Sequence, residues 1–573
     1  MTIAAVRTLR MARWLLPAEP DAAAVERLQQ ELHLPPAIAR LLACRGFGTS
    51  DDAKAYLRPR LDHLHDPNCL ADMDRAVARL VLALRDNETI LVHGDYDVDG
   101  ICSTTIMVRT LLAAGGNAIP FIPRRLEDGY DLTDAGVLAA RTAGATLVVT
   151  CDCGTSAVEP IADLQRSGID VIVTDHHLPG GPLPPAFAVL NPKRADCTSP
   201  DKDLAAVGVA FKLALSLTRA VGGNENIIYG MLDLVALATI ADVAPLRGEN
   251  RVFVRYGLKL LNDDPRPGIR ALVRAAGLER KALTSGRIGY ILAPRLNAAG
   301  RLGSALRGVE LLMAATDQLA NPIARELEEL NVTRQEMDRS TLSRARELVG
   351  ALDLSSTFGI VLAEPGWHAG VIGIVASRIV EEFGRPAVLI ALDGDHGKGS
   401  GRSISAFDLH AGLAQCSDLL LRFGGHRAAA GVTIATARVG EFADRFNRIA
   451  AGQLTEDDLV PELRVDLQIP FEQADDELEA LMRYMEPCGV GNPSPLLVSH
   501  GVVLAAPPRV VGKDGLKLLL RANGRELTAI GWGMAARARE LSVGVTLDVA
   551  FRLERDDWNG ESRLQARLAD FRT

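Results

Sequence analysis

The sequence of 573 residues lacks several features that mark particular classes of protein. It contains no stretch of about 18 consecutive apolar residues, so we expect no membrane span. Its first residues contain no apolar core followed by a small-residue cleavage site, so we expect no signal peptide. Eight irregularly placed cysteines, without a CxxC pair, exclude a disulfide framework. The expected location is therefore the reducing cytoplasm.

An excess of positive charge is also absent, because the formal net charge is −9. A phosphate backbone is bound mostly through Lys and Arg, so this balance taken alone argues mildly against a nucleic-acid partner. It does not exclude one, since binding depends on where the basic groups are focused, and a site for metal cations would itself need many carboxylates. The 48% of apolar and 24% of charged residues indicate a globular chain, with about three to four domains at roughly 150 residues each.

The pattern of residues changes along the chain and predicts its organisation. Residues 1–75 carry apolar residues at helical spacing and form a helical extension. At 76–307, short and almost wholly apolar runs alternate with amphipathic helices, which is typical of a parallel sheet covered on both faces. Residues 308–350 are rich in opposite charges at i,i+4 spacing, which favours a long, solvated connecting helix.

A second α/β unit is predicted at 351–457, and short alternating strands with turn signals follow at 458–573. These last strands fit a small β-barrel such as an OB-fold, although their number alone does not separate a barrel from a sandwich. The predicted fold class is α/β: a parallel-sheet domain, a smaller α/β domain joined to it by a long helix, and a C-terminal β-barrel.

The segment HGDYDVDG places one histidine, His93, and three carboxylates directly after a predicted strand. Asp95, Asp97 and Asp99 are so close that they raise one another's pKa unless a cation neutralises them. The segment therefore favours a metal site over a solvated acidic loop. An EF-hand is excluded, because its ligand spacing and terminal Glu are absent.

Three further apolar runs end in residues that can bind metals. Asp152 follows the run at 145–150, the triplet of Asp175, His176 and His177 follows the run at 170–174, and Asp242 ends the run at 236–241. Taken singly, an Asp after a strand is more often a helix cap, and adjacent histidines usually lie at the surface. Taken together, at the carboxyl ends of strands in one predicted sheet, they predict a single site.

The chemistry of these ligands indicates the metal. Carboxylates and imidazoles suit manganese or magnesium, with cobalt or zinc possible. Cys151 and Cys153 flank Asp152 and suggest zinc, but in a strand their side chains would point to the opposite face. We therefore interpret both cysteines as small, buried, apolar residues.

The four motifs HGDYDVDG, TCDCGT, TDHH and TIADV, in this order, resemble those of the DHH phosphoesterase superfamily. The resemblance implies two divalent cations, with manganese favoured over magnesium, and hydrolysis of a phosphoester by in-line attack. One cation would be held by His93, Asp97 and Asp152, and the other by Asp99, Asp152, His176 and Asp242. The implied catalytic residues are Asp97, Asp99, Asp152, His176, His177 and Asp242, with Asp95 and Asp175 in supporting positions.

Glycine-rich segments at 366–373, 399–403 and 423–431 resemble the DHH-associated domain of members that act on nucleic acids. Elsewhere such glycines are as often ordinary turns, and an arginine in a loop is usually solvated. Here the upstream motifs favour substrate contact, because backbone amides can approach phosphate and an arginine offers a bidentate fork. The implied contacts to DNA and its 5′-phosphate are Arg124, Arg301, His368, Ser400, Arg402, Ser403, Gly425 and His426.

The order of the segments is similar to the RecJ family over essentially the whole chain. This resemblance implies a monomeric exonuclease of recombination and repair that digests single-stranded DNA from the 5′ end and releases mononucleotides. A single-strand-binding protein and a helicase are the implied partners. A narrow passage between the two α/β units would exclude a duplex. Trp532 and Tyr484 could stack on bases, although a lone aromatic residue is more often part of a core.

Two other functions remain open from the sequence. The chain could be a DHH oligonucleotide or dinucleotide phosphodiesterase, which would stall on strands longer than a few nucleotides. It could also be a non-catalytic replication scaffold, although such relatives have lost metal ligands and none of the motif carboxylates or histidines is missing here.

Overall fold

The computed structural model describes residues 12–125, 127–556 and 562–573, which form two compact units. The central unit consists of His65–Pro461. The terminal unit combines Ala12–Leu64 with Glu462–Thr573, so that segments from both ends of the sequence share one unit. The sequence predicted the N-terminal helices but gave no signal for this pairing.

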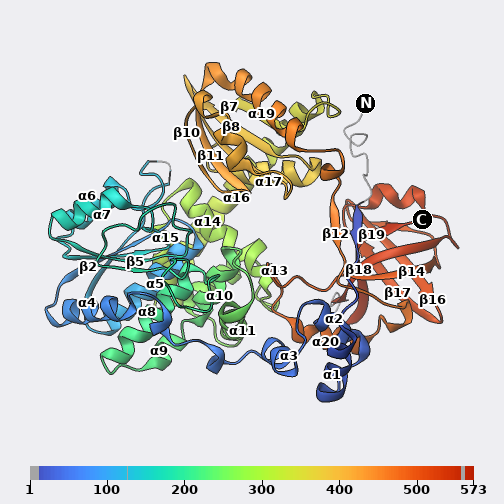
Figure 1. Ribbon diagram of the computed structural model, residues 1–573, viewed down its shortest axis with the longest axis horizontal. Coiled ribbons are helices and arrows are strands. Elements are labelled where there is room, and N and C mark those ends of the chain that lie inside the picture. Colours follow the sequence, from blue (N-terminus) through green and yellow to red (C-terminus); the bar gives the residue numbers. More distant parts are fainter. Residues whose placement is uncertain (1–11, 126, 557–561) are drawn as a thin grey trace. The chain divides into compact units, whose positions relative to one another are not determined.

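The first sheet of the central unit has five parallel strands in the order β3-β2-β4-β5-β6 (Figure 1). They are β2 (Thr89–Gly94), β3 (Asn117–Phe121), β4 (Leu147–Cys151), β5 (Asp170–Thr174) and β6 (Ala188–Leu190). The predicted parallel sheet is confirmed, because the apolar runs are buried on both faces. One face packs on α6 (Asp134–Thr142) and α7 (Val158–Arg166), and the other on α5 (Val98–Ala113) and α8 (Ala206–Ala220), which α4 (Met73–Arg85) contacts.

A group of helices follows the sheet. They are α9 (Glu225–Tyr229), α10 (Leu232–Ala241), α11 (Gly248–Asp263), α12 (Pro267–Ala275), α13 (Ser285–Arg287), a π-helix (Ile288–Leu292), α14 (Ala293–Leu302) and α15 (Leu306–Met313). One expectation is wrong here. The apolar run before Asp242 belongs to helix α10 and not to a strand of the sheet, and α10 is apolar all round because it is buried. Arg301 lies on helix α14.

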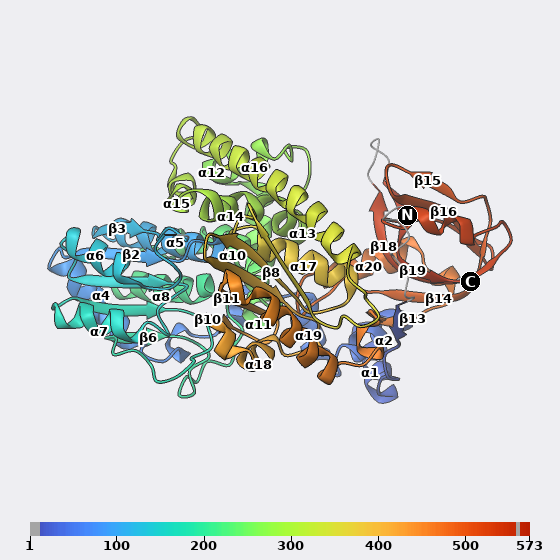
Figure 2. The same cartoon turned by 90° about the horizontal axis from the view of Figure 1, so that it is seen from above.

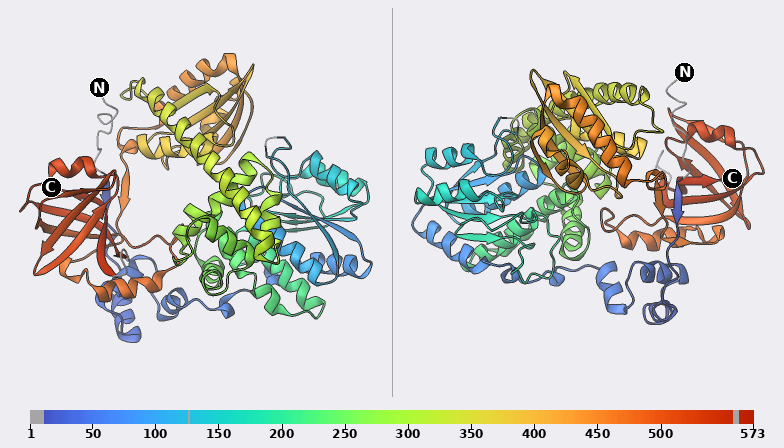
Figure 3. Two further views of the ribbon diagram at one scale, coloured as in Figure 1. Left: turned by 180° about the vertical axis from the view of Figure 1, so that it is seen from behind. Right: turned by 45° about the horizontal axis from the view of Figure 1, so that its top comes forward.

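The connecting helix α16 (Asp317–Gly350) has 34 residues and packs on α12 and α14 at one end and on α17 at the other (Figure 2; Figure 3, left view, yellow-green). The prediction that this helix is solvated is wrong for one of its faces, where Asn331, Arg334 and Asp338 are buried. No helix within the described ranges is long and apolar enough to cross a membrane.

The second sheet of the central unit has the order β10-β11-β9-β8-β7. Its strands are β7 (Ile360–Pro365), β8 (Ala387–Asp393), β9 (His396–Arg402), β10 (Leu420–Gly425) and β11 (Ala429–Ala435). Only β7 and β8 among these are parallel. Helix α17 (Ile372–Phe383) and the end of α16 pack on one face, and α18 (Leu409–Ala414) and α19 (Val439–Gln453) on the other.

The terminal unit contains a seven-stranded sheet in the order β13-β14-β18-β19-β17-β16-β15, which an additional pairing of β14 with β16 closes into a barrel. The strands are β13 (Leu467–Gln468), β14 (Leu497–Leu504), β15 (Arg509–Val511), β16 (Gly515–Ala522), β17 (Arg525–Gly531), β18 (Thr546–Asp556) and β19 (Arg563–Arg572). The predicted turn at 559–560 lies outside the described residues.

The N-terminal helices complete the core of this unit. Helices α1 (Ala22–Leu32), α2 (Pro36–Cys44) and α3 (Ser50–Leu57) share one apolar cluster with the barrel and α20 (Asp476–Met482). Strand β1 (Arg13–Leu15), which the sequence did not predict, pairs in parallel with β12 (Glu462–Arg464). Trp532 and Tyr484 lie outside the core, with exposed fractions of 56% and 48%.

Candidate functional site

The first acidic motif forms the turn between β2 and α5. Asp97 caps the helix, since its Oδ1 accepts hydrogen bonds from the backbone N–H groups of Asp99 at 2.9 Å and Gly100 at 3.2 Å. Position 100 has no room for a side chain, because a Cβ there would lie 2.3 Å from the backbone oxygen of Asp95. The tight turn therefore holds the three carboxylates of this motif at the carboxyl edge of the sheet.

Asp99 points into the interior, where helix α8 begins. Its two carboxylate oxygens accept hydrogen bonds from the backbone N–H groups of Ala206 and Val207, each at 2.8 Å. Burial and the neighbouring charge of Asp97 raise the pKa of Asp99 to about 7. The helix N-terminus favours negative charge and fixes the orientation of this side chain.

Asp152 lies between the other acidic groups of the site. It follows the last residue of β4 with a φ of +65°, a left-handed conformation that is uncommon for residues other than glycine. Its buried Oδ1 lies 3.3 Å from Nε2 of His176. Burial, followed by the charges of Asp99 and Asp97, raises the pKa of Asp152 well above its usual range. Strained backbone of this kind concentrates at functional sites.

Asp242 reaches the site from a helix. It is the C-cap of α10, and its Oδ2 lies 3.8 Å from Nδ1 of His176, so this imidazole stands between Asp152 and Asp242. Burial and the adjacent His177 lower the pKa of His176 to about 3. His176 is therefore neutral near pH 7, which is the form in which imidazole binds metals.

His177 forms a line of hydrogen bonds with two neighbours. Its Nδ1 lies 2.8 Å from Oδ1 of Asp175, and its Nε2 lies 3.1 Å from Oη of Tyr130. Burial opposes the imidazolium, but the hydrogen bond and charge of Asp175 outweigh it and raise the pKa of His177 to about 9. Burial likewise opposes the carboxylate of Asp175, whose pKa nevertheless falls because of His177. The sequence missed Tyr130, because a single tyrosine in a loop carries no pattern.

The donor set fits divalent cations. Among the residues that the structure describes, three groups have ligand atoms within 4.8 Å of one another. They are Asp152, His176 and His177; Asp99, His176 and Asp242; and Asp95, Asp97 and Asp152. Three buried atoms of these groups, Asp95 Oδ1, Asp152 Oδ1 and His176 Nε2, have no hydrogen-bond partner. Buried carboxylates without a partner are costly, and a cation would neutralise them.

His93 is a predicted metal ligand that these groups do not include. It is buried, its Nδ1 lies 3.5 Å from Sγ of Cys153, and burial lowers its pKa to about 4. Asp95, predicted in a supporting position, takes part in a group instead. Cys151 and Cys153 are both buried, as expected, but strand alternation does not explain the orientation of Cys153, because β4 ends at Cys151.

The central unit also contains a cluster of arginines, which we call the arginine pocket; Arg301 and Arg402 form it, and the charge of Arg125 acts on both. Arg402 ends β9 and donates to Oγ of Ser400 at 3.1 Å. Gly373, at the start of α17, packs so closely that a Cβ there would lie 2.8 Å from this hydroxyl oxygen. Burial and Arg125 lower the pKa of Arg402, and burial together with Arg125 and other arginines lowers the pKa of Arg301 to about 10. A helix N-terminus beside clustered guanidinium groups is a typical phosphate site.

The two adjacent arginines after β3 point in different directions. Arg124 is exposed and forms a surface ion pair with Glu127 at 3.0 Å. Arg125 is half-buried, and its guanidinium lies 4.8 Å from the centre of the Tyr96 ring. The charge of Arg125 acts on both Arg301 and Arg402, so Arg125 is a candidate for the phosphate contact that the sequence suggested for Arg124. The sequence alone cannot distinguish two neighbouring arginines in a loop.

The remaining predicted contacts take several positions. His368 accepts a hydrogen bond at Nδ1 from the backbone N–H of Gly370, whose carbonyl oxygen accepts from Arg301. The hydroxyl of Ser403 donates to the carbonyl oxygen of Phe407 at 2.8 Å and stabilises a turn. Gly425 and His426 lie where the hairpin of β10 and β11 turns. Arg295 forms an ion pair with Glu328 of α16.

Three family models match the chain in the order of its domains. The DHH family N-terminal domain matches residues 89–239, the DHHA1 domain matches 356–452, and the RecJ OB domain matches 465–570. A parallel sheet with an acidic and histidine-rich edge, followed by a DHHA1 domain, defines the chain as a DHH-family protein.

Relatives narrow this class further. The single-stranded-DNA-specific exonuclease RecJ of Bacillus subtilis is 36% identical over 97% of this chain and 70% of the relative. The RecJ of Escherichia coli is 35% identical over 93% of this chain and 95% of the relative. The crystal structure of RecJ in complex with Mn²⁺ from Thermus thermophilus has a TM-score of 0.84 at 33% identity and covers 98% of this chain and 79% of that one. The chain belongs to the RecJ family.

Proposed function

We propose that the chain is a metal-dependent exonuclease specific for single-stranded DNA, which digests from the 5′ end and releases 5′-mononucleotides in recombination and repair. One observation carries this proposal. The central unit holds a buried cluster of carboxylates and imidazoles at one sheet edge, and an arginine pocket that fits a phosphate. The relatives named as single-stranded-DNA-specific exonucleases support the substrate, and the family structures with Mn²⁺ and Mg²⁺ support the metals.

Two divalent cations, with manganese favoured, would be held by Asp97, Asp99, Asp152, His176 and Asp242. Asp152 would help to hold both, because it belongs to two of the three groups, and Asp95 and His93 are candidates for a further ligand. When bound, such cations neutralise charge on the scissile phosphate and lower the pKa of a water molecule. His177, held by Asp175 and Tyr130, would orient a phosphate oxygen.

The arginine pocket would set the polarity of digestion. Arg301, Ser400, Arg402 and Arg125 would hold the 5′-terminal phosphate, so that the next phosphate along the strand reaches the acidic cluster. Water attacks that phosphorus, the bond to the 3′ oxygen of the first nucleotide breaks, and this oxygen takes up a proton. Water is the final acceptor, and no covalent enzyme intermediate is needed. His368, Ser403, Gly425 and His426 remain candidates for contacts to the strand.

The barrel would hold the single strand beyond the catalytic unit. Exposed aromatic residues stack on bases without regard to sequence, and Trp532 and Tyr484 are the candidates. A narrow passage between the two α/β domains would exclude a duplex. We also propose that the chain acts as a cytoplasmic monomer, with a single-strand-binding protein and a helicase as partners.

Time courses on 5′-labelled and 3′-labelled single-stranded DNA, with and without Mn²⁺, test this function. We expect label at the 5′ end to appear at once as mononucleotide, while 3′-labelled strands shorten progressively, and both only with metal. Immediate release of mononucleotide from the 3′ end would contradict the polarity. A length series tests the alternative of an oligonucleotide phosphodiesterase, which would stall on strands longer than a few nucleotides.

A further inference from the structure

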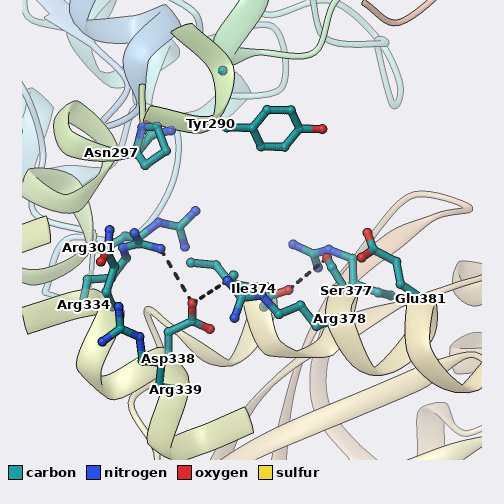
Figure 4. A pocket seen from close by; sticks show the side chains of 15 residues that line it. Tyr290, Asn297, Arg301, Arg334, Asp338, Arg339, Ile374, Ser377, Arg378 and Glu381 are labelled. Carbon is teal, nitrogen blue, oxygen red and sulfur yellow. Dashed lines mark hydrogen bonds and ion pairs between the residues drawn. The ribbon is translucent and has the colours of Figure 1, made fainter. Parts of the chain in front are cut away.

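A cavity of about 600 Å³ lies next to the arginine pocket in the central unit (Figure 4). Arg301 and Arg402 form one part of its wall, residues of α16 and α17 form a second part, and the π-helix and the start of α14 form a third. A volume of this size is typical of ligand sites, which measure roughly 300–1,000 Å³. The cavity is therefore larger than a site for one phosphate group needs.

The lining of the cavity is strongly cationic. Its five arginines are Arg301, Arg334, Arg339, Arg378 and Arg402, and its only two carboxylates within the described part of the chain are those of Asp338 and Glu381. A terminal monophosphate carries about two negative charges near pH 7 and would neutralise only the wall with Arg301 and Arg402. The wall formed by α16 and α17 would keep its excess of positive charge.

Buried polar atoms on that wall lack partners. Arg334 is 8% exposed, and although it donates to Oδ1 of Asn331 at 2.8 Å, its Nε has no hydrogen-bond partner. Asp338 is 2% exposed, and its Oδ2 forms an ion pair with Arg378 at 2.9 Å. Nη1 of Arg334 lies 3.9 Å from the same oxygen. In Figure 4 these side chains point toward one another across the cavity from two helices. Oδ1 of Asp338 on the same wall also lacks a partner. Leaving the buried guanidinium of Arg334 partly unpaired is costly, and a ligand with acceptor oxygens would satisfy its Nε.

We infer that this cavity binds the additional phosphates of a 5′-diphosphate or 5′-triphosphate strand end. The inference rests on the proposed function, since it places the first phosphate against Arg301 and Arg402. Arg334 and Arg378 would be the partners of the outer phosphates, because they line the same cavity as Arg301 and Arg402. The enzyme would accept strands that carry a triphosphate at the 5′ end.

The reaction on such a strand is the same hydrolysis with a different product. Water adds to the phosphorus of the second nucleotide, and the bond to the 3′ oxygen of the first nucleotide breaks. The first nucleotide leaves as a nucleoside 5′-triphosphate with a 3′ hydroxyl, and the shortened strand keeps a 5′-monophosphate. Only the first round therefore uses the cavity.

The experiment compares first-nucleotide release from strands of one sequence with a 5′-hydroxyl, 5′-monophosphate or 5′-triphosphate. We expect the wild-type chain to release nucleoside triphosphate within about threefold of the rate on the monophosphate strand. Arg378→Gln and Arg334→Gln should each slow release from the triphosphate strand at least tenfold and change release from the monophosphate strand less than twofold. Arg346→Gln is the matched control, because Arg346 also joins α16 to α17, through Glu382 at 2.8 Å, but does not line the cavity.

Several results would overturn the inference. A triphosphate strand digested no faster than the 5′-hydroxyl strand, with the monophosphate strand digested normally, would contradict the inference and leave the proposed function intact. Equal losses on both phosphorylated strands in Arg378→Gln would mean that the residue acts on the fold. If free ATP inhibits the wild type but not Arg378→Gln, while the triphosphate strand is not digested, the cavity binds a free nucleotide instead. No digestion of the monophosphate strand would overturn the proposed function together with this inference.

Discussion

The central unit contains two clusters of like charge that are opposite in sign. At the edge of the first sheet, burial and then repulsion between neighbouring carboxylates raise the pKa of Asp99, Asp152 and Asp242. Beside the second sheet, burial and then repulsion between neighbouring guanidinium groups lower the pKa of Arg301 and Arg402. Each cluster is electrostatically incomplete without ions of the other sign.

The opposite charges indicate that the acidic cluster binds cations and the arginine cluster binds phosphate. A cluster of carboxylates is stabilised by cations and a cluster of arginines by phosphates, so cations and a nucleic acid strand would complete both at once. The clusters also use different backbone devices. Strand ends and helix caps hold the acidic groups, whereas the arginines extend from helices and from a strand end.

Removal of metal gives the largest expected effect. If it had no effect on activity, the acidic cluster would not be a cation site and the contrast between the two clusters would be wrong. Chelation should abolish hydrolysis and leave the arginine pocket intact, because only the acidic cluster depends on cations. Added Mn²⁺ at 100 times its dissociation constant should stabilise the fold by about 2.7 kcal/mol for each bound ion. Activity assays and thermal unfolding with and without EDTA measure both effects. Full activity in EDTA would contradict the account.

Substitution of Asp152 tests the acidic cluster by itself. Asp152→Asn should lower kcat about 10³-fold or more, because this carboxylate belongs to two of the three groups of ligands. Its folded state should be at least as stable as the wild type without metal, since one repelling charge is gone. Asp163→Asn, on the surface of α7, is the control and should keep normal turnover. Near wild-type turnover of Asp152→Asn in Mn²⁺ would remove the proposed site.

Much of the acidic cluster could be predicted from the sequence, because its residues follow apolar runs in a parallel sheet. Asp97, Asp152 and His176 are of this kind. The role of His93 as a ligand stays a prediction; its ring is buried, and its Nε2 has no hydrogen-bond partner. Asp242 was predicted for the wrong reason, because an apolar run of ten residues can be a buried helix as well as a strand.

The arginine cluster was harder to predict, because it depends on contacts between distant helices. Arg334 and Asp338 sit in a helix whose charge pattern suggested solvent exposure, and only packing against α17 buries them. The choice between Arg124 and Arg125 depends on the direction of one loop. Sequence patterns predict single helices and strands well, but they do not predict which faces of two helices pack against each other.

The two adjacent arginines after β3 test which residue contributes to the arginine pocket. Arg125→Gln should raise KM for 5′-phosphorylated strands about 10-fold to 100-fold, as expected for one charged hydrogen bond of about 1.5–3 kcal/mol. Arg124→Gln should stay within about twofold, because Arg124 is exposed and pairs with Glu127. KM and kcat on strands with 5′-phosphate and 5′-hydroxyl ends measure the difference. A larger loss in Arg124→Gln would reverse our assignment.

The barrel should give the smallest effect. Trp532→Ala should weaken binding of long single strands about fivefold, the low end for loss of one stacked base, because the ring is 56% exposed. Cleavage of a dinucleotide should not change, since a dinucleotide offers no additional bases for stacking. Fluorescence anisotropy with long and short strands measures this effect. Equal losses for both lengths would point to a role for Trp532 in the fold.

The central claim is that the carboxylates and imidazoles of the first sheet edge form one centre for two cations. Electron paramagnetic resonance titration of Mn²⁺ into the metal-free chain tests it directly, because it counts tightly bound ions without relying on activity. The account predicts two Mn²⁺ per wild-type chain and loss of tight binding in Asp152→Asn. Two tightly bound ions in Asp152→Asn, or none in the wild type, would contradict it.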